Sequence, residues 1–337
     1  MNALLLNKNY ENYIYNYSSK FTNPLITYFN ITKFGPGYPN FNNNFDLKDI
    51  ENFYKKKFDF IIIGHHFLSE KLNGAIFDFK TSLNLNKIKI PIFFFLNKEY
   101  KNLKRNLEFI KKINTKAIFS HHHISKFLGK NFYFIPFGFD DNLINTSIEK
   151  NMDIFFSGIL KNNHAKFTNS NRLKIREEIF YHFLNFNLKK KNIYNNYKIY
   201  WNNFNYLSPY KKILGFFFKE LFQLSEKNYY RMLGLSKISF CTLSAYNQVG
   251  PRFFESLGSG CLVFCPKTNI YKKYSLDLTK NIIQFESEKD FTVKVKKYLD
   301  NYKNFENEIR TNQKSFVELY SYDSRSKDIF NIIKKNL

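Results

Sequence analysis

The stretch Ile238–Cys265, ISFCTLSAYNQVGPRFFESLGSGCLVFC, predicts a strand, a helix and a second strand in succession. We expect the strands at Ile238–Thr242 and Leu262–Cys265, because both are short apolar runs bounded by polar or glycine-containing turns. Between them, Pro251 suits the first position of a helix that continues to Leu257. A strand, helix and strand in this order indicate two parallel strands of one sheet.

The same alternation runs through the whole chain. In the first half it predicts six strands, at Ala3–Leu6, Leu25–Tyr28, Phe58–Ile63, Pro91–Leu96, Lys116–Ser120 and Phe132–Pro136, and its clearest helix at Glu99–Ile113. After the turn-forming stretch Phe137–Asp141, a second series predicts strands at Asp153–Ser157 and Lys198–Trp201. It predicts helices at Arg172–Leu184, Lys227–Leu235, Phe291–Leu299 and Phe316–Ile333, with a candidate interruption of the last helix at Ser321–Arg325. We therefore expect an α/β chain of two Rossmann-like domains, residues 1–148 and 149–337. A chain of 337 residues is long enough for two domains of ordinary size.

Composition limits the choice of partner and compartment. The chain has 52 Lys and Arg against 28 Asp and Glu, a formal charge of +24, which suits a nucleotide diphosphate, a membrane surface or a nucleic acid. The lysines are spread evenly among Asn, Ile, Phe and Tyr, as a compositional bias would place them, with no basic stripe, so nucleic-acid binding is not expected. Three cysteines in apolar segments, and no leader or apolar run of about 20 residues, predict a cytoplasmic protein.

The start of the predicted helix at Pro251 has the features of an anion site. Gly250 can turn the chain into the helix, and the helix N-terminus with the guanidinium of Arg252 attracts negative charge. Glu255 shares the helix face of Arg252 one turn on, where its carboxylate can accept from two vicinal hydroxyls, as on a ribose. The small residues Gly258–Gly260 would let a nucleotide approach. The alternative is a surface ion pair between Arg252 and Glu255 and glycines that merely end a helix.

Two runs in this region resemble the donor site of GT-B glycosyltransferases. They are Tyr229–Thr242, YYRMLGLSKISFCT, and Gly250–Phe264, GPRFFESLGSGCLVF. The chain is similar to the spore-maturation (CgeB-like) type of group 1 glycosyltransferases and to exostosin-like domains. Further matching segments are FIPFG at 134–138, DIFFSG at 153–158 and YSYDSR at 320–325.

The resemblance, which covers about residues 90 to 330, implies a function. It implies two domains facing across a cleft, C-terminal helices packing back, and transfer of a sugar from a nucleotide-diphosphate sugar to a glycan, lipid-linked or protein acceptor. Arg252 takes the place of the phosphate-side arginine and Glu255 that of the ribose-binding glutamate. Asn247 stands where many group 1 enzymes have another glutamate, so a binding protein of this shape that has lost catalysis stays an alternative.

Further candidates complete the expected site. On the donor side they are Gly250, Ser259 and Gly158, with Lys161 and Arg172 as cations for the leaving diphosphate; each of these two is equally interpretable as a solvated surface cation. No metal or other cofactor is expected, because a helix dipole and cationic side chains can stabilise that group.

On the acceptor side, the candidate catalytic groups are His65, His122 and Glu99, which follow predicted strands at their carboxyl ends. His65 and His122 each stand in a run of contiguous histidines with no Cys or carboxylate at ligand spacing, and such runs do not predict a metal site. The alternative to a catalytic role is that these are ordinary structural histidines. Basic patches could also bring the protein to an anionic membrane and a lipid-linked acceptor.

Overall fold

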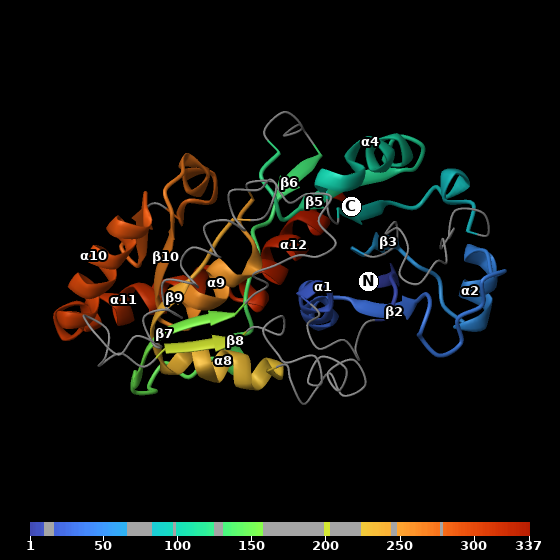
Figure 1. Cartoon of the computed structure of the whole chain (residues 1–337). Coiled ribbons are helices and arrows are strands. Elements are labelled where there is room, and N and C mark those ends of the chain that lie inside the picture. Colours follow the sequence, from blue (N-terminus) through green and yellow to red (C-terminus); the bar gives the residue numbers. More distant parts are fainter. Residues whose placement is uncertain are drawn as a thin grey trace, which may run out of the picture. The chain divides into compact units, whose positions relative to one another are not determined.

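The computed structural model describes residues 1–9, 17–65, 83–96, 99–124, 131–157, 199–202, 224–243, 248–276 and 279–337. Its chain forms two compact units, each built on a parallel sheet, which confirms the predicted α/β class (Figure 1). The first unit is Met1–Pro136 with Tyr322–Leu337, and the second is Phe137–Ser321. This division differs from the expected one at 148/149 in two ways: the boundary lies at 136/137, and the last helix belongs to the first unit.

The first unit contains a six-stranded sheet in the order β2-β1-β3-β4-β5-β6. The strands are β1 (Asn2–Leu6), β2 (Asn30–Phe34), β3 (Phe60–Ile63), β4 (Ile92–Phe95), β5 (Thr115–Ser120) and β6 (Phe132–Phe134). The order reverses between β1 and β3, so the connections from these two neighbouring strands lead away in opposite directions. In open α/β sheets, ligands bind outside the carboxyl ends of the strands at such a switch point.

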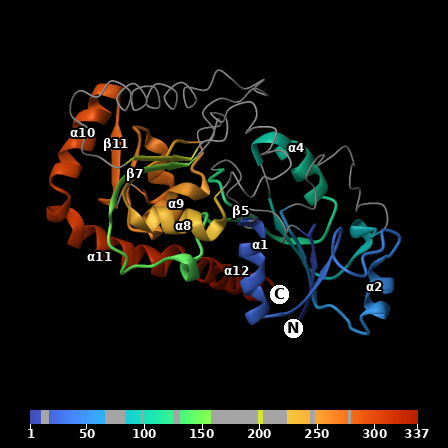
Figure 2. The same cartoon turned by 60° about the horizontal axis from the view of Figure 1, so that its bottom comes forward.

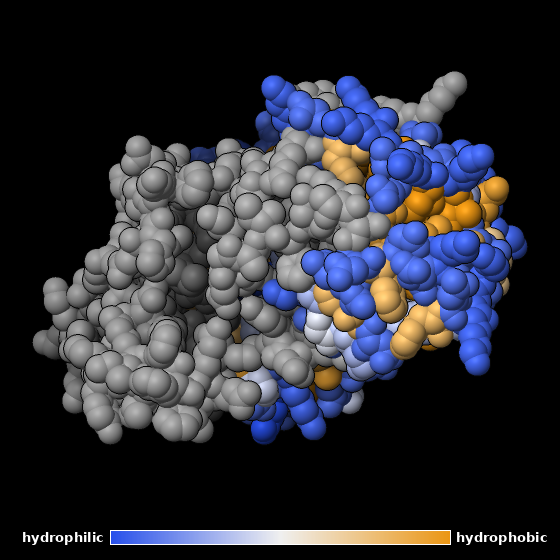
Figure 3. Space-filling model, turned by 90° about the vertical axis from the view of Figure 1, so that its right-hand side faces the viewer, coloured by the Kyte–Doolittle hydropathy of each residue, from blue (hydrophilic) through white to orange (hydrophobic). Residues whose placement is uncertain are grey.

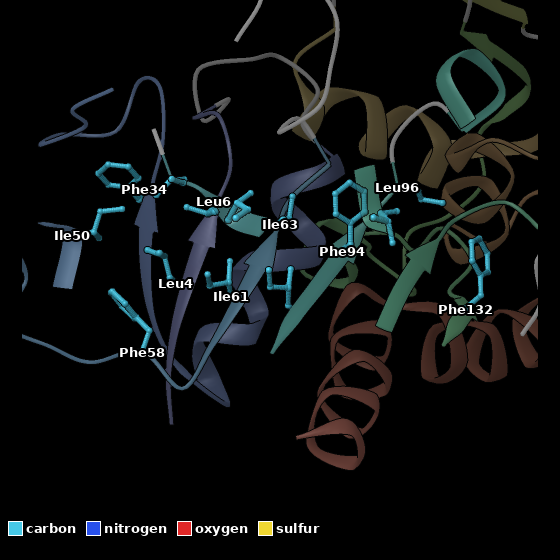
Figure 4. Packing of buried hydrophobic residues seen from close by; sticks show 14 residues of the cluster. Leu4, Leu6, Phe34, Ile50, Phe58, Ile61, Ile63, Phe94, Leu96 and Phe132 are labelled. Carbon is cyan, nitrogen blue, oxygen red and sulfur yellow. The ribbon is translucent and has the colours of Figure 1, made fainter. Parts of the chain in front are cut away.

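Helices cover both faces of this sheet. One face packs under α2 (Leu47–Phe53) and α4 (Glu99–Ile110), with Leu4, Ile61 and Phe94 in the buried cluster drawn in Figure 4. The other face lies under α1 (Tyr17–Thr22), the 3-10 helix η1 (Asn23–Thr27) and α12 (Tyr322–Asn336). Burial on both faces explains why most of these strands are continuous apolar runs in the sequence.

One predicted strand of the first unit is wrong. Leu25–Tyr28 was expected to be a strand, but residues Asn23–Thr27 form η1, with Pro24 at its start. Only Leu25 of that run is fully buried, whereas Ile26 is 51% exposed, so the apolar letters do not mark a core strand. The edge strand is β2 instead, in which the half-buried Ile31 and Lys33 alternate with the buried Thr32 and Phe34.

The second unit contains a five-stranded sheet in the order β11-β10-β9-β7-β8. The strands are β7 (Met152–Ser157), β8 (Ile199–Asn202), β9 (Ser236–Phe240), β10 (Leu262–Pro266) and β11 (Ile282–Phe285), and the helices are α8 (Glu226–Leu235), α9 (Pro251–Gly258), α10 (Glu288–Asp300) and α11 (Tyr302–Tyr320). Helices α8 and α9 lie side by side (Figure 2). The switch point of this sheet lies between β7 and β9.

Most predictions for the second unit agree with these elements. The helix expected from Phe316 to Ile333 is two helices, α11 and α12, which meet at Ser321 inside the predicted interruption. Strand β11 was not predicted. The helix expected at Arg172–Leu184 lies outside the described residues.

The outer surface of the first unit is mixed in character. Hydrophilic side chains surround smaller hydrophobic patches on the face shown in Figure 3. Phe53 at the end of α2 is 48% exposed. None of the helices among the described residues is long and apolar enough to cross a membrane.

Candidate functional site

The amino end of α9 is the best-defined candidate site in the second unit. Gly250 is the N-cap residue in an extended conformation, and Pro251 occupies the first turn, as the sequence predicts. A Cβ atom added to Gly250 would meet no atom of the described residues within 4 Å. The first-turn N–H groups of a helix have no intrahelical acceptor and attract an anion.

This helix end lies at the switch point between β7 and β9. The guanidinium carbon of Arg252 is 6.0 Å from the ring centroid of Phe156, which lies near the carboxyl end of β7. Cys241, which follows β9 directly, places its Sγ 3.7 Å from the carbonyl oxygen of Arg252. Both neighbouring strands therefore contact the first turn of α9, and the cation of Arg252 lies where a ligand of this architecture is expected.

Cys241 is part of the packing that holds α9 in this place. Burial raises the pKa of its thiol to about 11, so it is uncharged at neutral pH, in keeping with its interpretation as a core residue. Close by, the hydroxyl oxygens of Ser239 and Ser256 are 2.8 Å apart and connect β9 to α9. The helix start is thus fixed to the sheet by small buried polar groups.

Glu255 lies one turn further along α9 and is only 2% exposed. The hydroxyl of Tyr229 in α8 donates to its Oε2 at 2.8 Å. Burial first, and then the charge of Glu255, raise the pKa of Tyr229 well above its ordinary value. The alternative of an ordinary surface ion pair does not fit a carboxylate that is buried and hydrogen-bonded in this way. The site combines a cation and helix N-terminus for an anion with a carboxylate that can accept from hydroxyls.

Ser259 lies at the opposite end of the same helix, so the structure does not bring it together with Gly250 and Arg252. It is the C-cap residue, and its carbonyl accepts from the ammonium of Lys150 at 2.7 Å. Gly258 and Gly260 end the helix: a Cβ on Gly258 would lie 2.6 Å from the ring of Phe139, and Gly260 has φ +70°. These small residues serve packing and chain reversal, as the alternative interpretation had it.

In the first unit, two histidines meet at the carboxyl ends of β3 and β5. Nε2 of His65 is 2.5 Å from Nε2 of His121, and the rings stack with centroids 4.7 Å apart. Nδ1 of His121 donates to the carbonyl of Ile135 at 2.8 Å, so in the neutral pair its Nε2 accepts from Nε2–H of His65. The chain of two hydrogen bonds fixes the tautomers of both rings, with the acceptor nitrogen of His65 at Nδ1.

This pair adjoins the switch point of the first sheet. Gly64, directly before His65, has no room for a side chain, because a Cβ there would lie 2.6 Å from Cγ of Asn7. Asn7 follows β1 and is buried. Burial lowers the pKa of His121 to about 4, and the hydrogen bond to Ile135 only partly offsets this effect, so the imidazole is neutral at physiological pH.

The other predicted catalytic groups, His122 and Glu99, are not part of this hydrogen-bonded pair. His122 is 8% exposed, and burial together with the charge of His121 lowers its pKa to about 3. The structure therefore pairs His65 with His121 and not with the predicted His122. Glu99 begins α4, as predicted, but its side chain lies outside the described residues.

Three predicted donor-side residues, Gly158, Lys161 and Arg172, also lie outside the described residues. Within the described part of the chain, no group of three or more His, Cys, Asp or Glu side chains is arranged to hold a metal ion. The roles of the three residues, and a metal-independent mechanism, stay predictions.

The comparisons bear on the fold. Residues 191–331 match a family model described as Glycosyl transferase-like. The structure is similar to HepE from Anabaena, solved with UDP and glucose, with a TM-score of 0.55 and 10% identity over 99% of this chain and 100% of that one. It is also similar to sucrose-phosphate synthase from Thermosynechococcus elongatus, with a TM-score of 0.58 and 8% identity over 99% of this chain and 98% of the other.

The chain has the GT-B fold. A third similar GT-B structure is AviGT4, a glycosyltransferase of avilamycin A biosynthesis, with a TM-score of 0.53 and 9% identity over 100% of this chain and 98% of that one. No curated protein sequence matches the chain significantly. The family match covers α8, α9 and the sheet around them, so the resemblance expected from Tyr229–Thr242 and Gly250–Phe264 is confirmed at the level of a glycosyltransferase-like sequence with the GT-B fold.

Two residues of this GT-B chain were missed by the sequence analysis. Tyr229 was quoted only as part of a matching run, and its contact with Glu255 depends on how α8 packs beside α9. His121 was passed over for His122, although alternation along β5 supplies a signal: residues 119 and 121 share a face, and Phe119 is in the core.

Proposed function

We propose that this GT-B chain transfers a sugar from a nucleoside-diphosphate sugar to a hydroxyl-bearing acceptor. The observation that carries the proposal is the amino end of α9 at the switch point of the second sheet, with Arg252 over Phe156 and the buried Glu255 one turn behind. A cation and a carboxylate at this spacing suit a diphosphate and a vicinal diol respectively.

The comparisons support the same class of reaction. The family match lies over the donor-side elements, and the similar HepE structures were solved with UDP and with UDP-glucose. We further propose that the chain is close to the spore-maturation type of group 1 enzymes, with exostosin-like features, as its runs at Tyr229–Thr242 and Gly250–Phe264 suggest. The acceptor would be a glycan, a lipid-linked molecule or a protein.

The donor would bind in a defined orientation. The diphosphate would lie in front of Gly250 at the N-terminus of α9, with Arg252 as its planar donor, and the ribose hydroxyls would donate to Glu255. As the glycosidic bond breaks, charge grows on the leaving diphosphate, and the helix N-terminus and the guanidinium stabilise that charge without a metal ion. Lys161 and Arg172 would add positive charge there.

The acceptor side would use the histidine pair. His65 would take the proton of the acceptor hydroxyl at Nδ1, while His121 and the carbonyl of Ile135 hold its other nitrogen as a donor. His122 and Glu99 remain further candidates for a catalytic role.

Thermal unfolding with nucleotides tests the proposal. UDP, GDP, TDP, ADP and CMP are added with EDTA to the wild type, Arg252→Ala and Glu255→Ala, because a ligand that binds only the native state raises its stability by about 2.7 kcal/mol at 100 times Kd. We expect one nucleotide to stabilise the wild type and to lose most of this effect in both variants. Arg231→Ala, on the exposed side of α8, is the matched control and should behave as the wild type.

The same assay separates the alternatives. If no nucleotide stabilises the wild type with or without Mg²⁺, the proposal is wrong. If stabilisation appears only with Mg²⁺, metal independence is wrong. If the nucleotide binds but its sugar conjugate is neither transferred nor hydrolysed, the chain is a binding protein of this fold.

A further inference from the structure

Tyr229 occupies a defined position between α8 and the sheet. Its helix begins after Ser225, which caps the backbone of Asn228. Its ring lies 5.8 Å from that of Phe155 in β7 and 5.7 Å from that of Tyr230, centroid to centroid. These two ring contacts restrict the ring, and its hydroxyl is directed toward Glu255.

The hydroxyl can act only as a donor toward this carboxylate. Burial and the charge of Glu255 both raise the pKa of Tyr229, so the phenol keeps its proton at every working pH. It donates to Oε2 at 2.8 Å. A carboxylate has about four lone-pair positions on two oxygens, so a single bond from Tyr229 restricts the orientation of Glu255 without exhausting its capacity to accept from hydroxyl groups.

We infer that Tyr229 is a positioning residue that orients Glu255 for the 2′- and 3′-hydroxyls of a ribose, so that the site distinguishes ribonucleoside from 2′-deoxyribonucleoside diphosphates. The inference rests on the proposed function. A side chain that holds a buried acceptor in place makes the loss of one ligand hydroxyl costly, because the acceptor cannot turn to another partner.

The test compares matched nucleotides on matched variants. Affinities for UDP, GDP and ADP and for their 2′-deoxy counterparts are measured by calorimetry on the wild type, Tyr229→Phe and Tyr230→Phe. Tyr230 is the control, because its neighbouring hydroxyl accepts from the backbone N–H of Asp140 at 3.2 Å instead of contacting Glu255. For the base that binds, we expect the wild type and Tyr230→Phe to prefer the ribonucleotide about tenfold, which corresponds to about 1.4 kcal/mol. Tyr229→Phe should retain less than about threefold preference.

Each outcome decides a different point. If Tyr229 had a purely structural role, Tyr229→Phe would weaken the binding of both nucleotides equally and leave the ratio of their affinities unchanged. That result would overturn the inference while the proposed function stands. An equal fall of the ratio in Tyr230→Phe would also overturn it. Binding of no nucleoside diphosphate to the wild type would overturn the proposed function and this inference with it.

Discussion

At the scale of single residues, buried imidazoles link the stability of the first unit to pH. His121 and His122 have pKa values lowered by burial to about 4 and about 3, from 6.5 in an exposed histidine. Near pH 8 both are neutral in the folded and the unfolded chain, so they add almost no pH dependence there. Below pH 6.5 the unfolded chain binds protons that the folded chain does not, and the free energy of unfolding falls as the pH falls.

The slope is predictable for each residue. One such histidine costs up to about 1.4 kcal/mol per pH unit, or about 2 kcal/mol between pH 8 and pH 5. Urea unfolding at pH 8, 7, 6 and 5 should show this loss of unfolding free energy. His122→Gln should lose less between pH 8 and pH 5 than the wild type does. Any difference between the two proteins at pH 8 itself reflects the substitution and not the titration. The variant keeps the bonds between Ser120 and the backbone of residue 122. Equal slopes for the wild type and the variant would contradict the argument.

The residues of the candidate site were only partly predictable for a physical reason. Arg252 and Glu255 share a helix, so their spacing in sequence gives their spacing in space. The contacts of Tyr229 with Glu255 and of His65 with His121 join residues 26 and 56 positions apart, and they depend on the packing of two elements. A single sequence carries no direct record of that packing.

At the scale of elements, the two ends of α9 tolerate a side chain very differently. Gly258 faces the ring of Phe139, which is fully buried and stacks on Phe316 with centroids 5.9 Å apart. A Cβ on Gly250 would meet nothing within 4 Å among the residues that the structure describes. We therefore expect Gly258→Ala to lower the free energy of unfolding by about 1–3 kcal/mol through overpacking.

Gly250→Ala is the matched control for this substitution. It should cost less than about 1 kcal/mol, the loss of a glycine N-cap. Chemical denaturation of both variants measures the difference. If Gly258→Ala is as stable as the wild type, the packing of α9 against Phe139 is less tight than described.

Elements were predicted well where burial alone determines the sequence pattern. Strands β3, β4 and β10 are apolar along their whole length and were found from the sequence. The pattern failed at one edge of each sheet: β2 and β11 bury only alternate residues, and the apolar run at Leu25–Tyr28 belongs to a 3-10 helix next to Pro24. The opposite edge strands, β6 and β8, were found from the sequence. An edge position is a property of the assembled sheet, so a short local pattern does not reveal it.

At the scale of the whole molecule, α12 ties the end of the chain to the first unit. Ser326 donates from its hydroxyl to the carbonyl of Phe21 at 3.3 Å, and Tyr28 stacks on Phe330 at 4.5 Å between centroids. Ile329 and Ile333 are fully buried. The predicted boundary at 148/149 assigned these residues to the second domain, although the resemblance implied C-terminal helices that pack back. The contacts of α12 with Phe21 and Tyr28 show that this helix packs on the first unit.

Because α12 packs in the first unit, we expect substitutions in α12 to destabilise that unit and to leave α9 and its sheet unaffected. Ile329→Ala with Ile333→Ala should cost about 2–5 kcal/mol at each position, because each leaves a cavity in a buried face. Hydrogen exchange should then lose protection in β1, β3 and β5 while β9, β10 and the nucleotide stabilisation are unchanged, since β7, β9 and α9 all belong to Phe137–Ser321. Lys334→Ala with Lys335→Ala, on the exposed side of the same helix, should leave both units protected. Loss of protection that begins in β9 or β10 would show instead that α12 stabilises the second unit.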